Sequence, residues 1–279
     1  MHVDVIADAV RASIAEAATT LRPDALDALA AAAARERSER GRRVLAQLLE
    51  NARIASRDAV PLCQDTGTVW VWVELGVEEP LEGDLASAVN SAVRDAYASN
   101  ALRMSVVEDA LIGRVNTGDN TPAFIDLTGR PGRGATVHTM LKGGGSDNAS
   151  ALSMLDPSAG RDGVARFVLD TVSAKATGAC PPLMIGVGVG GTFDTVAKLA
   201  KKALLRPVGV PSADPAIASL EAELLAGVNA LGIGPAGLGG DTTALAVHVL
   251  TAPCHIAALP VAVNLGCSAM RSVTVELDS

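Results

Sequence analysis

Residues 178–202 read GACPPLMIGVGVGGTFDTVAKLAKK, and this stretch decides the fold. An apolar run from Leu183 leads into the glycine-rich stretch GVGVGG (186–191), and a segment with helical spacing follows. A strand that passes directly into a helix is the basic unit of α/β proteins. The spacing G-x-G-x-x-G also occurs in dinucleotide-binding turns, so the stretch has two interpretations.

The dinucleotide interpretation requires an acidic residue about 20 positions further on, at the end of a second strand. After Gly191 the chain instead reaches LRPVGVPSADP (205–215), a proline-broken connection without a strand. Only the first half of the motif is present. We therefore predict that these glycines let a helix pack closely against a strand. The alternative interpretation, a nucleotide-dependent oxidoreductase, has no support in the sequence besides this motif.

Hydrophobic periodicity extends the α/β pattern to both sides of this stretch. Helical spacing is expected at 3–21, 23–36, 42–55, 84–99, 163–176, 192–205 and 213–230, and strands at 67–76, 122–127, 134–143, 244–252 and 256–265. The predicted fold class is α/β, with mixed, mostly parallel sheets flanked by helices. We predict a single domain over 1–279, with a helical N-terminal segment over 1–55 packed on it.

Composition excludes several classes of protein. The chain has 279 residues, enough for a sizeable core, and its net charge of −8 argues against a nucleic-acid partner. No apolar run has the length needed to span a bilayer, and the N-terminus carries Asp and Glu where a signal peptide would be basic. We expect a cytoplasmic protein.

Three of the four cysteines are placed as ligands would be. Cys63, Cys180 and Cys267 each lie beside a strand-like segment, among Gly, Pro or polar residues. They are too far apart in sequence for a zinc finger. Three thiolates on distant loops would leave one coordination position open, as a catalytic metal needs, although lone cysteines are more often buried apolar side chains.

Two further glycine runs suggest anion binding. LKGGGSDNAS (141–150) has its lysine before the glycines, whereas a P-loop has it after them, and GIGPAGLGGDTTA (232–244) has no basic residue. Runs of this kind can gather backbone amides around an anion, although each can equally be a simple turn.

Several blocks together resemble a known family. PLCQDTGT (61–68), KGGGSDN (142–148), the block 179–206, GLGGDTTALAV (237–247) and HIAALPVAVNLGC (255–267) resemble the α-type subunit, or N-terminal iron–sulfur domain, of class I fumarate hydratases and L-tartrate dehydratases. The blocks follow one another in family order from about residue 40 to the C-terminus.

The resemblance implies a [4Fe-4S] cluster on Cys63, Cys180 and Cys267. Cys254 falls where the family has another small residue, so we expect it not to be a ligand. The fourth iron would bind substrate and act as a Lewis acid on the hydroxyl that leaves or enters.

The resemblance also implies roles for polar residues around the cluster. Gln64 and Asp65 would touch substrate, and Asp65 would handle a proton together with His255. Arg103 would clamp a substrate carboxylate, for which a planar guanidinium is suited. The alternatives are a structural turn cap for Asp65 and a surface arginine for Arg103.

The glycine loop and the stretch after the third cysteine complete the implied site. Gly144 and Gly145 would offer backbone amides to substrate, and Arg271 keeps a basic position within CSAMRSVTVE (267–276). The family commonly has histidines in that stretch, and Ala149 stands where a lysine is frequent. We therefore expect a dicarboxylate substrate without specifying which one.

The implied function is that of an α subunit in a hydro-lyase acting on a fumarate-, malate- or tartrate-like dicarboxylate. The family's second, β-type domain does not follow Cys267 in this chain. We expect a separate β subunit to complete the site in an α2β2 assembly, with activity only in its presence. The alternative is a non-catalytic [4Fe-4S]-binding or iron-responsive protein derived from the same fold.

Overall fold

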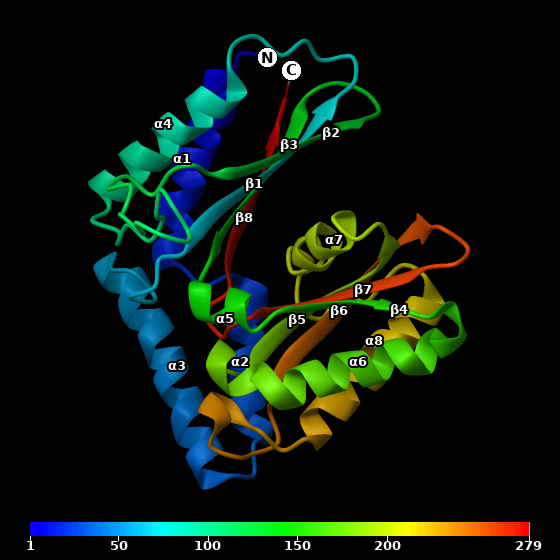
Figure 1. Cartoon of the computed structure of the whole chain (residues 1–279). Coiled ribbons are helices and arrows are strands. Elements are labelled where there is room, and N and C mark those ends of the chain that lie inside the picture. The colour runs from blue at the N-terminus through cyan, green and yellow to red at the C-terminus, as the bar shows by residue number, and fades with distance from the viewer. Residues whose placement is uncertain (279) are drawn as a thin grey trace. The chain divides into compact units, whose positions relative to one another are not determined.

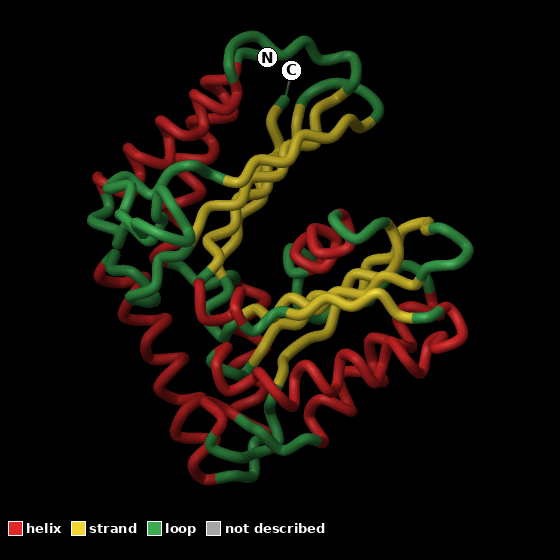
Figure 2. Tube along the Cα trace, in the orientation of Figure 1, coloured by secondary structure: helices red, strands yellow, loops and turns green. Residues whose placement is uncertain are grey.

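The computed structural model describes residues 1–278 and divides the chain into two compact units (Figure 1). The first unit comprises Met1–Arg22, Ala52–Gly144 and Arg271–Ser279, and the second comprises Pro23–Asn51 and Gly145–Met270. Each unit contains its own four-stranded sheet (Figure 2).

The first unit has the strand order β2-β1-β3-β8 and two helices against one face of that sheet. Its buried core forms because Val69, Val71 and Val73 alternate along β1 and point at the helices. The elements are α1 (Val3–Thr19), β1 (Thr68–Gly76), α4 (Leu85–Ser99), β2 (Phe124–Arg130), β3 (Ala135–Lys142) and β8 (Arg271–Leu277).

The second unit has the strand order β4-β7-β5-β6, with α7 on one face of the sheet and α6 and α8 on the other (Figure 1). Its elements are α2 (Pro23–Arg35), α5 (Gly144–Asn148), β4 (Ala151–Leu155), α6 (Gly160–Lys175), β5 (Leu183–Gly191), α7 (Thr195–Ala203), α8 (Pro215–Ala230), β6 (Ala244–Cys254) and β7 (Leu259–Gly266). Helix α3 (Glu39–Asp58) contributes residues to both units, and short 3-10 turns occur at Pro157–Ala159, Ala176–Ala179 and Pro235–Gly237.

The glycines of the opening stretch allow α7 to pack directly on β5. A Cβ atom at Gly186 would lie 2.1 Å from the carbonyl oxygen of Ala200, and one at Gly188 would lie 2.5 Å from that of Val196. Both distances are shorter than any normal contact, so only glycine fits. The predicted close helix–strand packing is confirmed.

The α/β class, the flanking helices and the helical N-terminal segment are confirmed. The expectation that most paired strands run parallel is wrong. Among the described residues, β1–β2 and β5–β6 are parallel, whereas β1–β3, β3–β8, β4–β7 and β5–β7 are antiparallel. Strands β4 and β8 were not expected. Each binds the edge of another strand, and single-strand periodicity does not reveal that pairing.

The single-domain organisation over 1–279 stays a prediction. The structure assigns α1 to the first unit and α2 to the second, so the helical segment 1–55 is shared between them.

The expectation about membrane-spanning runs is wrong for one helical stretch. Pro215–Gly237 is long and apolar enough to cross a bilayer by length and composition alone. Core helices can pass the same test, and Leu220, Leu224 and Val228 of this stretch are buried in the core of the second unit.

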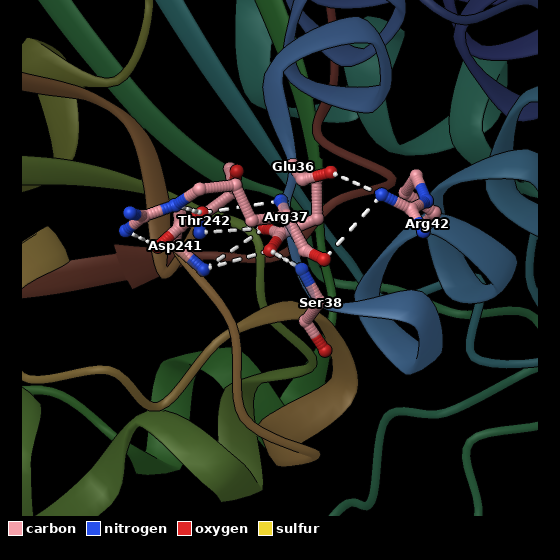
Figure 3. Close-up of polar contacts among 6 residues, drawn as sticks. All are labelled: Glu36, Arg37, Ser38, Arg42, Asp241 and Thr242. Atoms are coloured by element: carbon pink, nitrogen blue, oxygen red, sulfur yellow. Dashed lines mark hydrogen bonds and ion pairs between the residues drawn. The ribbon is translucent and has the colours of Figure 1, made fainter.

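A buried carboxylate joins two distant segments of the second unit (Figure 3). Glu36 follows α2 and is 2% exposed. Its carboxylate accepts hydrogen bonds from the backbone N–H groups of Ser38 (2.9 Å), Asp241 (2.9 Å) and Thr242 (3.0 Å). Outside this core contact, the Arg37 guanidinium forms a two-pronged ion pair with Asp241.

Candidate functional site

In the first unit, the predicted site segments gather at one end of the sheet. The segment 63–67 leads into β1, whose first residue Thr68 pairs with Lys142 at the end of β3. Gly143 and Gly144 follow β3 directly, and Arg271, the first residue of β8, pairs with Leu141. Sheet register therefore brings together three segments that are far apart in sequence.

The structure brings Gln64 and Arg103 into direct contact. The Arg103 guanidinium Nη1 donates a hydrogen bond to Oε1 of Gln64 at 2.8 Å, and both side chains are exposed. The Thr66 hydroxyl donates to the carbonyl oxygen of Arg103. Because these contacts fix the start of the 103–123 segment on the 63–67 loop, Arg103 presents a positive charge beside Gln64.

Asp65 is held by backbone donors. Its Oδ1 accepts the N–H of Gly67 (3.1 Å) and its Oδ2 accepts the N–H of Gly144 (2.8 Å). The amide of Gly144 therefore fixes Asp65, where the sequence predicted that it would face substrate directly. A Cβ atom at Gly143 would lie 3.1 Å from Oδ2 of Asp65, so a side chain at this position would crowd the carboxylate.

Arg271 is a buried cation at the same end of the sheet. It is 2% exposed, and neither its Nε nor its Nη1 has a hydrogen-bond partner. A Cβ atom on Gly143 would lie 3.5 Å from its Nη2 and 3.1 Å from Asp65 Oδ2, which places both charges around this glycine. Buried N–H donors without partners are costly, so this arrangement is suited to an anion that accepts from them.

Two residues that were not predicted to belong to the site shape the 63–67 loop. The fully buried hydroxyl of Tyr97 lies 2.9 Å from the carbonyl oxygen of Thr66 and 3.1 Å from that of Gly67. Asn120, also fully buried, donates its Nδ2 to the Gly67 carbonyl at 3.2 Å. Burial chiefly raises the pKa of Tyr97, so its phenol stays protonated and donates. For Tyr97, the sequence offered one indication of such a role: it is the only tyrosine of the chain, and it lies on the apolar face of a predicted helix.

In the second unit, Cys180 and Cys267 lie at a shared end of the sheet. Cys180 precedes β5 and Cys267 follows β7, and these strands are antiparallel neighbours with Met184 opposite Gly266. The backbone N–H of Ser268 donates to the carbonyl oxygen of Cys180 at 3.2 Å. The two cysteine loops are therefore hydrogen-bonded neighbours, and neither cysteine forms a disulfide.

Cys254 and His255 lie at the opposite end of that sheet. Cys254 ends β6, and the turn after it contains His255, whose Nδ1 accepts the N–H of Ala257 at 3.1 Å. The eight residues of β7 separate this turn from Cys267, which is roughly 25 Å at about 3.3 Å per residue. The structure does not bring Cys254 or His255 of one chain to the ends that hold Cys180 and Cys267.

A buried ion pair holds the short helix α5, which contains Gly145. Lys201 of α7 is 6% exposed, and its Nζ lies 3.0 Å from Oδ1 of Asp147. Asn264 of β7 donates to the same carboxylate oxygen at 3.0 Å. Burial lowers the pKa of Lys201, and the charge of Asp147 opposes that shift. Lys201 occupies an ordinary helix position, and only the tertiary contact shows its role.

The predicted ligands are divided between the units, with Cys63 in the first and Cys180 and Cys267 in the second. Within residues 1–278, no group of three His, Cys, Asp or Glu side chains is close enough to hold a metal ion. The loops instead offer thiols at strand ends, a carboxylate fixed by two amides, and two arginines. Within the first unit, the carboxylate of Asp65 can exchange a proton, and the guanidinium groups of Arg103 and Arg271 can bind anionic groups.

A family model and individual relatives both match nearly the whole chain, and both point to the same family. The family model described as fumarate hydratase (Fumerase) matches residues 7–276. The chain is 41% identical to a putative L(+)-tartrate dehydratase subunit alpha of Methanocaldococcus jannaschii, over 98% of this chain and 99% of that protein. It is 36% identical to the L(+)-tartrate dehydratase subunit alpha of Escherichia coli strain K12, over 92% of this chain and 86% of that protein.

Proposed function

Because this chain belongs to the fumarate hydratase (Fumerase) family, we propose that it is the α subunit of a hydro-lyase. The enzyme adds water to, or removes it from, a small dicarboxylate, and a separate β subunit completes it. The relatives named L(+)-tartrate dehydratase subunit alpha support a partner subunit and make L(+)-tartrate the first substrate to test.

The observation that carries this proposal is the buried Arg271. In this guanidinium, which is 2% exposed, Nε and Nη1 have lost their hydration without gaining protein acceptors. A substrate carboxylate would supply two acceptors in the planar geometry that arginine favours. Arg103, oriented by Gln64 in the same unit, is the candidate for the second carboxylate.

We assign a [4Fe-4S] cluster to Cys63, Cys180 and Cys267. The chemistry of these residues fits, because thiolates are soft ligands, none of the three cysteines forms a disulfide, and Cys180 and Cys267 lie on hydrogen-bonded loops. When bound, the cluster supplies a Lewis-acidic iron for the hydroxyl group.

The chain's own residues bind the substrate and move its proton. Arg103 and Arg271 hold the carboxylates, and Gln64 orients Arg103. Asp65 handles a proton with its carboxylate fixed by the N–H groups of Gly67 and Gly144. Gly144 thus acts through Asp65, whereas an amide contact from Gly145 to substrate stays a prediction.

We propose that the His255 that acts with Asp65 belongs to a second copy of the chain. His255 and Cys267 belong to one unit and are separated by the length of β7, roughly 25 Å. A histidine that serves the cysteine end would therefore come from a neighbouring α subunit, which is consistent with an α2β2 assembly. A cytoplasmic location stays a prediction from the sequence.

The test combines iron content with activity. Anaerobic reconstitution with iron and sulfide should load the wild type and Cys254→Ser, while Cys63→Ser, Cys180→Ser and Cys267→Ser lose the cluster spectrum and its iron. The reconstituted chain with its β subunit should turn over L(+)-tartrate, fumarate or malate, and the chain alone should not.

Arg271→Lys should lower kcat/KM about 10- to 100-fold without loss of iron, because a hydrogen bond to a charged group is worth about 1.5–3 kcal/mol. The exposed Arg40→Lys on α3 is the matched control and should be neutral. A loaded chain that binds its β subunit but acts on none of these substrates would instead support the iron-binding alternative.

A further inference from the structure

An ordered arm follows Arg103 in the first unit. We define the arm as residues 106–117. Its two sides are joined by backbone hydrogen bonds from Glu108 N–H to Val115 O (2.8 Å) and from Thr117 N–H to Val106 O (3.0 Å). The arm therefore has a fixed, hairpin-like base, although it contains no regular strand.

The tip of the arm exposes large apolar side chains. Leu111 is 84% exposed, Ile112 is 86% exposed and Val115 is 60% exposed. Single exposed apolar residues are ordinary on a protein surface, but three within five positions form a local patch. Such a patch is unfavourable in water unless another surface covers it.

The tip is already held in one conformation. The carboxylate of Asp109 accepts the N–H groups of Leu111 (2.9 Å), Ile112 (2.9 Å) and Gly113 (2.7 Å). Arg114 donates its Nη1 to the carbonyl oxygen of Ala110 at 2.6 Å. Preordering of this kind lowers the entropy cost of binding a partner.

The base of the arm is built into the candidate site. Buried Asn120 accepts the N–H of Ser105 at 2.7 Å and donates to the carbonyl of Gly67 at 3.2 Å. Asn116 donates to the carbonyl of Met104 at 3.0 Å. Asn120 thus connects the residues that flank the arm to the 63–67 loop, and Asn116 connects the arm itself to the residue after Arg103.

We propose that the arm is the docking surface for the β subunit. The inference rests on the proposed function, in which a separate subunit completes the site that contains Gln64, Asp65 and Arg103. That subunit has to lie against the 63–67 loop, and the residues on either side of the arm, Arg103 and Asn120, are hydrogen-bonded to that loop. Permanent interfaces bury apolar side chains of this kind, so docking of the β subunit covers the tip.

The test uses the double variant Leu111→Asn/Ile112→Asn. Both side chains are exposed, so the free α chain should keep its melting temperature, its iron content and its own oligomeric state. Affinity for the purified β subunit should fall at least tenfold in a sedimentation or calorimetric titration. The control variants Val77→Asn and Phe193→Asn, at residues 72% and 67% exposed, should bind the β subunit as the wild type does.

A second readout does not depend on substitution. Amide hydrogen exchange in 106–117 should slow when the β subunit is added to the wild-type chain, whereas exchange around Phe193 should not change. Wild-type binding that the double variant retains, with no protection of the arm, would overturn the docking surface and leave the proposed function intact.

Two other outcomes also decide against the proposal. Loss of α self-association in the double variant, with β binding retained, would assign the arm to contacts between copies of this chain. A wild-type chain that does not bind the β subunit at all would overturn the proposed function together with this inference.

Discussion

Glu36 shows how a single residue can hold two distant segments together. Its carboxylate is surrounded by backbone N–H groups from the turn before α3 and from residues 241 and 242 (Figure 3). Cβ atoms on Gly41 and Gly240 would lie 2.8 Å and 2.9 Å from Glu36 atoms, so both segments approach it closely. Burial raises the pKa of Glu36, but the hydrogen bonds together lower it by more, so the net shift of the pKa is downward.

Replacing Glu36 with Gln should lower the free energy of unfolding by about 1–3 kcal/mol at pH 7, because the amide cannot accept from all of the buried donors. A carboxyl group whose pKa is lower in the folded state stabilises the fold above its unfolded pKa of about 4.3. That contribution is lost as the pH falls through the lower, folded pKa. Urea titrations of both proteins at several pH values should therefore show a difference that shrinks in acid, and a difference that grows would contradict the assignment.

At the scale of elements, the contact between β5 and α7 depends on missing side chains. Gly186 and Gly188 lie directly beneath the carbonyl groups of Ala200 and Val196, which brings the helix against the strand. The helix in turn pairs Lys201 with Asp147, so this packing also positions helix α5, which contains Gly145. One close approach thus links the core of the second unit to the candidate site.

Gly186→Ala should destabilise the chain by about 1–3 kcal/mol or more, because an added methyl group in a packed core forces the backbone to shift. Gly178→Ala is the matched control, since no atom lies within 4 Å of its Cβ position. Thermal unfolding of the two variants would measure the difference. Equal melting temperatures would show that α7 does not pack on β5 as described.

At the scale of the whole molecule, the chain passes between its two units four times, at residues 22–23, 51–52, 144–145 and 270–271. Each unit has its own apolar core. Nevertheless, neither unit is a continuous piece of chain, and α3 contributes residues to both. A chain interleaved in this way is expected to fold as one cooperative structure.

Unfolding should therefore be a single transition, and the two tryptophans allow the test. Trp70 and Trp72 both lie on β1, so their fluorescence reports on the first unit alone, whereas far-ultraviolet circular dichroism reports on both units. Coincident denaturant curves would support the single domain predicted over 1–279. A fluorescence transition separated from the circular dichroism transition would show two independent domains.

Local features of the sequence were sufficient to predict most helices and strands and part of the candidate site. The alternating valines of β1, the helical spacing of α1 and the glycines before α7 each depend on neighbours within a few residues. Strand β8 alternates as well, but its role depends on pairing with β3 across more than a hundred residues. The roles of Tyr97 and Asn120 in the 63–67 loop depend on contacts of the same kind.

The sequence by itself determined the fold class, the thiols at strand ends and the family, because spacing and motif are local properties of the chain. Only the tertiary structure decided the mainly antiparallel sheets, the unpaired burial of Arg271 and the distance between His255 and Cys267. These depend on which strands become neighbours. That choice minimises the free energy of the whole chain and is not encoded in any single segment.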